Sequence, residues 1–160
     1  MYSSKHLELT DGTITGFRTH LTGELAALLS AESVLRHSVV PMPELAFDDL
    51  DPGGFDEGWE RAALGPVTAD LFSIRARQVL GGRSRKAGSS FLLGLLIGHE
   101  CAGLIGAGDE PGVVLLGGGP LRAWYQRGLE KSLGGRLLVA AEEEIAMAIA
   151  RAHVFLFRRR

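Results

Sequence analysis

The sequence predicts an α/β protein in which a small sheet is covered by helices. A strong turn signal, Asp11-Gly12, separates two segments of alternating character near the N-terminus. An unbroken apolar run at 113–116 is followed by the glycines 117–119 and a helical pattern, and a second strand and helix follow at 136–152. The order hairpin, helices, strand, helix, strand, helix is typical of a sheet packed against helices.

The first element is a β-hairpin over residues 5–18. It leads into Thr22, a candidate N-cap for a helix over 23–29 that carries Glu24 in its first turn. A second short helix is predicted around 33–36.

Residues 41–58 carry three prolines, Gly53-Gly54 and six acidic side chains. The composition predicts a solvated surface loop. Its acids at 48, 49 and 51 could bind a cation, but a solvated loop is the simpler interpretation.

Two helices follow. The segment 68–80 is predicted to be a helix that ends at Gly81-Gly82. One side is predicted to carry Leu71, Phe72, Ile74 or Arg75, and Val79. A polar connection at 83–86 precedes a largely apolar helix over 90–105, which is expected to pack on several sides.

The C-terminal third is predicted to form a βαβα unit. Residues 113–116 lack alternation, which favours a buried parallel strand. A helix over 121–133, a strand over 136–139 and a helix over 140–152 follow, the last with an apolar side at Ala141, Ile145 and Ile149.

Composition narrows the function classes. The chain has 160 residues, 46% apolar and 22% charged side chains and a net charge of −2, which fits one globular domain and predicts neither a nucleic-acid nor a membrane partner. Cys101 is the only cysteine, so an intrachain disulfide is excluded and a cytoplasmic location is expected. The apolar run Phe91–Gly98 is too short to span a bilayer.

The turn Gly117-Gly118-Gly119 is the most informative local feature for chemistry. A buried strand, glycines and a helix start can present bare backbone and N–H groups to a nucleotide or an anion. Arg122 stands where a dinucleotide fingerprint needs glycine, and no P-loop motif occurs. A tight turn without a ligand is the alternative.

A second candidate is the junction of the hairpin and the first helix. The hydroxyls of Thr19 and Thr22 and the backbone of Gly23 could hold phosphate oxygens at that helix N-terminus. The alternative is that Thr22 only caps the helix.

Metal and hydrolase chemistry are not predicted. None of the five histidines has zinc-ligand spacing, and the side chains of the run His99-Glu100-Cys101 are expected to diverge around a helix. Cys101 is interpreted as a small buried hydrophobe. No Gly-x-Ser-x-Gly motif is present.

Several segments resemble the 2-dehydro-3-deoxygalactonokinase family. Residues 11–35 resemble its pattern DG-I-x-x-F-x-T-x-MTGELFALL-S-x-x-SVL, residues 71–76 resemble LFSVRA, and residues 92–100 resemble YLSGLLIGAE. With the turn at 117–119, four segments in the same order cover most of the chain.

The resemblance implies an actin-like, ribonuclease-H-like kinase fold, in which two α/β domains close over ATP and a sugar acid. It implies phosphoryl transfer from ATP, with Mg²⁺, to the terminal hydroxyl of 2-dehydro-3-deoxy-D-galactonate in galactonate catabolism. By the same resemblance Gly117, Gly118 and Gly119 match an adenosine-side turn, while Thr19, Thr22 and Gly23 match a phosphate-contacting turn.

The chain also departs from the family pattern. The family's Gly-Thr-His-Ser-Lys-Trp corresponds to residues 1–6 here, where only Ser4 and Lys5 match, and these two are possible site residues. His6 replaces the tryptophan, and Leu21 replaces the methionine of MTGE.

Residues 1–160 are expected to form a single C-terminal kinase domain without the N-terminal kinase domain. The catalytic acids are expected on that other domain, so the chain alone should be inactive or weakly active. Three interpretations stay open: a truncated C-terminal part, a split kinase that pairs with a separate N-terminal domain, and a non-catalytic nucleotide-binding or interaction remnant that dimerises.

Overall fold

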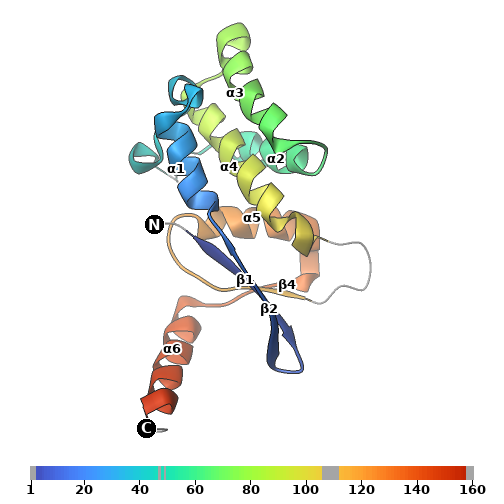
Figure 1. Cartoon of the computed structure of the whole chain (residues 1–160), viewed down its shortest axis with the longest axis vertical. Helices are drawn as coiled ribbons and strands as arrows, with labels where there is room; N and C mark the ends of the chain where they lie inside the picture. The colour runs from blue at the N-terminus through green and yellow to red at the C-terminus, as the bar shows by residue number, and fades with distance from the viewer. Residues whose placement is uncertain (1–2, 47, 49, 106–111, 158–160) are drawn as a thin grey trace. The chain divides into compact units, whose positions relative to one another are not determined.

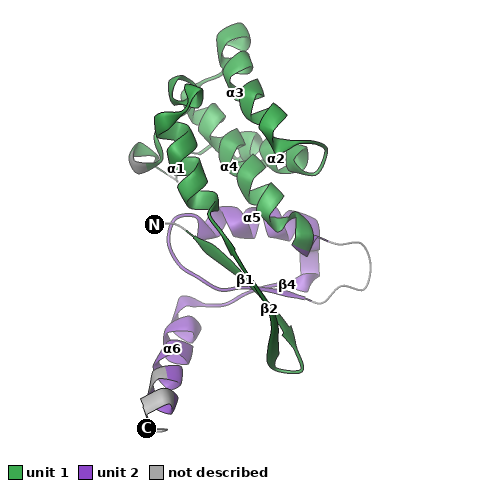
Figure 2. Cartoon of the chain, in the orientation of Figure 1, with its two compact units in different colours: residues 1–103 green, residues 104–160 purple. Residues whose placement is uncertain are grey.

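The computed structural model describes residues 3–46, 48, 50–105 and 112–157. The chain divides into two compact units, residues 1–103 and 104–160 (Figure 2). The first unit holds a hairpin and four α-helices, and the second holds a parallel pair of strands and two α-helices. An α/β architecture is therefore confirmed, and the single domain over 1–160 stays a prediction.

The hairpin consists of β1 (Ser4–Thr10) and β2 (Thr13–His20). The strands are antiparallel, and Thr10 lies opposite Thr13, so Asp11 and Gly12 form a two-residue turn. Both turn residues have positive φ, 50° and 75°. This is the backbone that a type I′ turn requires and that Asp-Gly favours, so the predicted hairpin is confirmed.

The helices of the first unit pack around its last helix (Figure 1). This helix, α4, contacts the other three helices of the unit. Its central residues, 88–98, are all buried. Packing on several sides is thus confirmed, although α4 begins at Arg85 and includes part of the predicted polar connection. The helices are α1 (Thr22–Glu32), α2 (Pro52–Ala62), α3 (Val67–Gly81) and α4 (Arg85–Cys101), with short 3₁₀ turns η1 (Val34–His37), η2 (Met42–Glu44) and η4 (Ala102–Leu104).

Glycines allow α2 and α4 to approach backbone to backbone. A Cβ at Gly94 would collide with the carbonyl oxygen of Phe55, and one at Gly58 would collide with that of Phe91. Side chains at these positions would force the helices apart, so the two glycines fix the distance between the helices.

The prediction of a solvated loop over 41–58 is wrong, because Met42 and Leu45 are buried in the first half and a helix forms in the second. Helix α2 begins at Pro52, where Asp51 is the N-cap and its carboxylate accepts hydrogen bonds from the N–H groups of Gly53 and Gly54 at 3.3 and 2.7 Å. Asp-Pro-Gly-Gly resembles a turn, but an aspartate before a proline is also a helix start. Phe55 is fully buried. The side chain of Asp49 lies outside the described residues.

Helix α3 ends as predicted, with Gly82 in the left-handed region at φ 65°. Its predicted apolar side is confirmed only at Ile74, because Phe72 and Val79 are 64% and 59% exposed. The buried side carries Ile74 and Asp70, one turn apart. Arg61 donates to the Asp70 carboxylate at 2.7 Å, and this ion pair lets a charged residue occupy the packed side.

The second unit contains β3 (Val113–Leu115), α5 (Arg122–Leu133), a 3₁₀ turn η5 (Gly134–Arg136), β4 (Leu137–Val139) and α6 (Glu142–Phe157). Strands β3 and β4 pair in parallel, which confirms that part of the prediction. Full burial is wrong, because Val114 and Leu138 are 56% and 59% exposed. Among the described residues each strand has one partner, and the side chains alternate between a covered and an open face.

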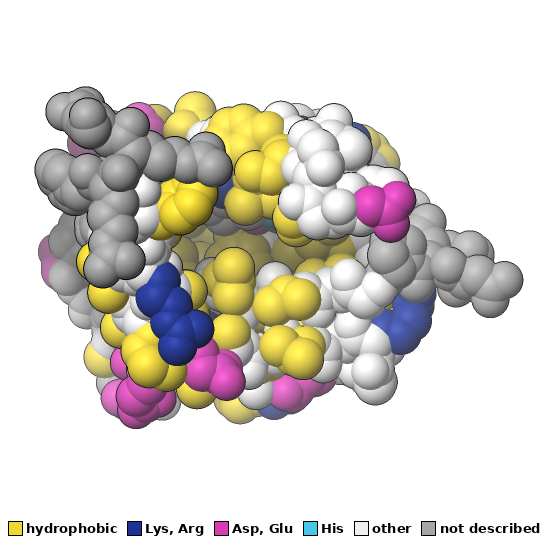
Figure 3. All heavy atoms as spheres, turned by 90° about the horizontal axis from the view of Figure 1, so that it is seen from below, with side chains coloured by type: hydrophobic (Ala, Val, Ile, Leu, Met, Phe, Trp, Pro, Cys, Tyr) yellow, Lys and Arg dark blue, Asp and Glu magenta, His cyan; other side chains and the backbone are white. Residues whose placement is uncertain are grey.

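Helix α6 runs further than predicted, and its apolar side is open. Ile149 and Phe155 are 54% and 55% exposed. The hairpin also exposes apolar side chains, namely Leu7, Leu9, Ile14 and Phe17. Figure 3 shows hydrophobic side chains at the surface of the molecule seen from below.

One helical stretch, Arg85–Leu104, is long and apolar enough to cross a membrane by length and composition alone. Of its most apolar window, 72% is buried inside the protein, as in the core helix of a globular unit.

Candidate functional site

The glycine turn between β3 and α5 has an open backbone. Gly117 and Gly119 have φ of 143° and 85°, values that side chains rarely adopt. Among the described residues, no atom lies within 4 Å of a Cβ built on either glycine. These two glycines therefore meet a conformational need, and the space beside them is available to a ligand.

Two charged side chains adjoin the turn within the second unit. A Cβ built on Gly118 would lie 3.5 Å from Oε1 of Glu142, an ordinary contact distance. Arg122 donates to the carbonyl oxygen of Ala140 at 2.7 Å and lies 3.4 Å from Glu142. A carboxylate accepts hydrogen bonds from hydroxyl and amino groups and repels phosphate, so the turn suits the nucleoside end of a nucleotide.

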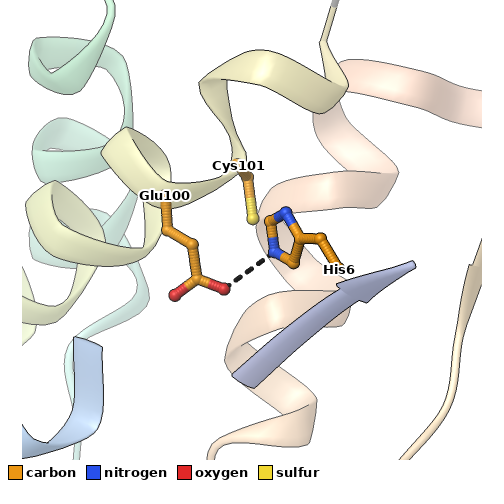
Figure 4. Close-up of side chains that lie close together, drawn as sticks. All are labelled: His6, Glu100 and Cys101. Carbon is orange, nitrogen blue, oxygen red and sulfur yellow. Dashed lines mark hydrogen bonds and ion pairs between the residues drawn. The ribbon is translucent and has the colours of Figure 1, made fainter. Parts of the chain in front are cut away.

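A second cluster centres on Glu100, whose side chain is 1% exposed at the end of α4. The Ser4 hydroxyl donates to its Oε1 at 2.6 Å, and Nε2 of His6 lies 2.9 Å from the same oxygen (Figure 4). The Thr22 hydroxyl donates to Oε2. These bonds satisfy a buried carboxylate, and they join β1, α1 and α4 at one point.

The prediction that Thr22 caps its helix is wrong. Leu21 is the N-cap and makes no side-chain capping bond, while Thr22 is the first helical residue. The single hydroxyl proton of Thr22 goes to Glu100, a stronger acceptor than the backbone groups nearby.

The predicted site residues of the hairpin and the first helix do not all lie together. Thr19 and Lys5 are exposed and lie directly opposite each other on β2 and β1. Gly23 is buried in the first turn of α1. Ser4 and Thr22 meet at Glu100, and the pair Lys5–Thr19 is not in that network.

The side chains of Glu100 and Cys101 were expected to diverge around the helix, but both lie beside His6. Figure 4 shows both side chains beside the His6 ring, and one ligand atom of each of the three residues lies within 4.8 Å of the others. Neighbours on a helix can flank the same strand when that strand runs past the helix end. Cys101 is buried, as predicted, and burial together with the adjacent Glu100 charge raises the pKa of its thiol.

The role of Glu100 was missed at the level of sequence. It is the single acidic residue in the run 87–105, and a charge inside a buried helix must be paired. It also lies within the segment 92–100 that carries the family resemblance.

Comparison with known proteins gives one consistent result. The family model described as 2-keto-3-deoxy-galactonokinase matches residues 2–152. A 2-dehydro-3-deoxygalactonokinase of Rhizobium meliloti (strain 1021) is 34% identical over 93% of this chain and 49% of its own length. The 2-dehydro-3-deoxygalactonokinase of Escherichia coli (strain K12) is 34% identical over 79% of this chain and 42% of its own length.

A solved structure agrees with these relatives. The crystal structure of a protein from Sinorhizobium meliloti, described as a 2-dehydro-3-deoxygalactonokinase, is similar with a TM-score of 0.75 and 34% identity. The match covers 94% of this chain and 49% of that one. The chain thus spans about half the length of the relatives that it matches.

Proposed function

Since this chain belongs to the 2-keto-3-deoxy-galactonokinase family, we propose that it supplies the nucleotide-binding half of an ATP-dependent sugar-acid kinase. The proposed reaction transfers the γ-phosphoryl group of ATP to the terminal hydroxyl of 2-dehydro-3-deoxy-D-galactonate. The actin-like arrangement of two domains around the nucleotide is part of the proposal.

The open turn at Gly117–Gly119 is the observation that carries the proposal. Its exposed backbone can pack against the flat adenine and ribose, and Glu142 can accept hydrogen bonds from donor groups of the nucleoside. Arg122 links the start of α5 to Ala140, between β4 and α6, so it positions the Glu142 carboxylate beside the turn.

Within the first unit, we propose that the hairpin contacts phosphate. The exposed ammonium of Lys5 and the hydroxyl of its cross-strand neighbour Thr19 can bind phosphate oxygens. Ser4, Thr22 and Gly23 support this surface from the buried side, where Glu100 holds both hydroxyls.

ATP would supply the phosphoryl group, and Mg²⁺ would neutralise the phosphate charge during transfer. Mg²⁺ prefers oxygen ligands such as carboxylates. We place those acids, and the base that accepts the proton of the sugar hydroxyl, in the half of the relatives that this chain does not match.

A second candidate function is an interaction module that pairs with a separate N-terminal kinase domain or with a second copy. The observation that favours it is the apolar side of the hairpin, where Leu7 lies opposite Phe17 and Leu9 opposite Ile14. Such an exposed apolar surface on a two-stranded edge is typical of a site that a partner covers.

The test is ATP-dependent phosphorylation of 2-dehydro-3-deoxygalactonate by the purified chain, alone and mixed with the N-terminal half of the Escherichia coli relative. We expect ATP binding by calorimetry in both samples and turnover only in the mixture. No ATP binding in either sample would overturn the kinase proposal. A stable complex without ATP binding would favour the interaction module.

A further inference from the structure

We propose that His6, Glu100 and Cys101 form a binding site for a zinc ion. The three residues come from β1 and the end of α4, all within the first unit. The site shares the Glu100 network that supports the proposed phosphate surface, but zinc binding is measured without nucleotide and does not depend on the kinase proposal.

The donor set matches zinc chemistry. One imidazole nitrogen, one carboxylate oxygen and one sulfur lie within 4.8 Å of one another. Zinc binds these three atom types at about 2.0–2.3 Å in tetrahedral sites, which places ligand atoms about 3.5 Å apart. Small rotations of the side chains would close the remaining gap. Mg²⁺, which prefers oxygen ligands, is disfavoured by the sulfur and nitrogen.

A second observation points to a missing group near the His6 ring. The Nε2 atom of His20 is buried and has no hydrogen-bond partner among the described residues. Its ring centroid lies 4.3 Å from that of His6. A buried imidazole nitrogen without a partner costs free energy, and a metal ion near His6 would satisfy it.

The surroundings hold the ligands in place. The Ser4 and Thr22 hydroxyls donate to Glu100, which orients the carboxylate as outer-shell hydrogen bonds do around known metal sites. Cys101 is 1% exposed, so it is shielded from competing reactions in solution. On binding, a zinc–sulfur bond forms, the S–H bond breaks and its proton passes to the buffer.

The experiment is calorimetric titration of the metal-free chain with zinc alone, repeated in two buffers of different ionisation enthalpy. We expect one ion per chain and an apparent enthalpy that changes with the buffer, because a thiol proton is released. Titration with Co²⁺ should produce the charge-transfer band of a cobalt–thiolate bond. Absence of binding, or binding without this band, would overturn the proposal.

Three variants locate the ion. Cys101→Ser and His6→Gln should each lower zinc affinity about 10-fold or more, since even outer-shell partners commonly contribute that much. His99→Gln is the control, because His99 is exposed on the same turn of α4 and should not change the affinity. Equal affinity in all three variants would place the ion elsewhere. If circular dichroism shows that Cys101→Ser does not fold, His6→Gln, which keeps the thiol, decides the question.

Discussion

The glycines at the contact of α2 and α4 and those of the turn after β3 have different structural roles. At Gly58 and Gly94 a Cβ would collide with backbone atoms of the facing helix. At Gly117 and Gly119 a Cβ would meet open space, and the glycine is required only by its positive φ. At the helix contact the space beside the glycines is filled by the protein itself, and at the turn it is open to a ligand.

This contrast shows what a glycine-rich sequence leaves undecided. The same residue type marks a tight helix contact in one region and an exposed turn in the other. Because only the second kind leaves backbone accessible, the two can be separated by substitutions that test stability and ligand binding independently.

The largest expected effect is at the helix contact. Gly94→Val should lower the free energy of unfolding by about 3 kcal/mol or more, because its Cβ must displace the backbone of Phe55. The measurement is urea unfolding followed by circular dichroism. Gly65→Val is the matched control, since no described atom lies within 4 Å of its Cβ. Equal stability of the two variants would contradict the close contact of α2 and α4.

The next effect concerns the turn. Gly118→Val should lower ATP affinity about 10-fold or more, equivalent to about 1.4 kcal/mol, by placing a side chain on the proposed nucleoside surface. Gly118 lies outside the positive-φ region and its Cβ would make only an ordinary contact, so the melting temperature should not change.

The control for this variant is Gly135→Val, at an open position in the η5 turn. Calorimetry should show unchanged ATP affinity for it. Equal affinities of the Gly118 and Gly135 variants would remove the adenosine assignment of the turn.

A smaller effect is expected at the start of α2. Asp51→Ala should lower the free energy of unfolding by about 1 kcal/mol, because the N–H groups of Gly53 and Gly54 lose their side-chain acceptor. Asp51→Asn keeps an acceptor oxygen and should retain most of the stability. Identical thermal melts for the alanine variant and the native chain would show that the cap contributes little.

The smallest effect is expected at Glu57, which pairs with Arg77 and with Arg83, the latter at 2.8 Å. Burial alone would raise the pKa of Glu57, but hydrogen bonds from the two arginines outweigh it and lower the pKa below the ordinary 4.5. The ion pairs of Glu57 with the two arginines therefore stabilise the fold above about pH 4.5. This contribution is lost as the pH falls through the lower pKa that Glu57 has in the native state.

Glu57→Gln should reduce stability by less than about 1 kcal/mol at pH 7, since the side chain is 40% exposed and screened by solvent. Stability measured against pH should differ between variant and native chain at neutral pH and converge in acid. A difference that grows as the pH falls would contradict the direction of the pKa shift.

Much of the fold could be predicted because its signals are local. Asp11-Gly12 determines a hairpin through two positive φ values, and Gly82 ends α3 by adopting the left-handed conformation. The parallel pairing of β3 and β4 follows from their unbroken apolar runs. Helix α2 was missed because Asp-Pro-Gly-Gly fits a turn as well as a capped helix start.

The candidate site was less accessible to prediction, for two reasons. The glycine turn is local and could be identified, but whether its backbone is open depends on what lies around it in three dimensions. The Glu100 cluster joins residues 78 to 96 positions apart, and no local pattern encodes such a meeting. The isolated charge in an apolar helix was the only signal.

The bonds to Glu100 also affect the order of events during synthesis. Ser4 is made 96 residues before its partner, so β1 cannot dock until α4 has left the ribosome. Until then the hairpin can form its own turn but has no buried carboxylate to dock against, and its apolar face stays open to other chains. We expect β1 to be synthesised well before α4 and to be secured only after α4 has formed.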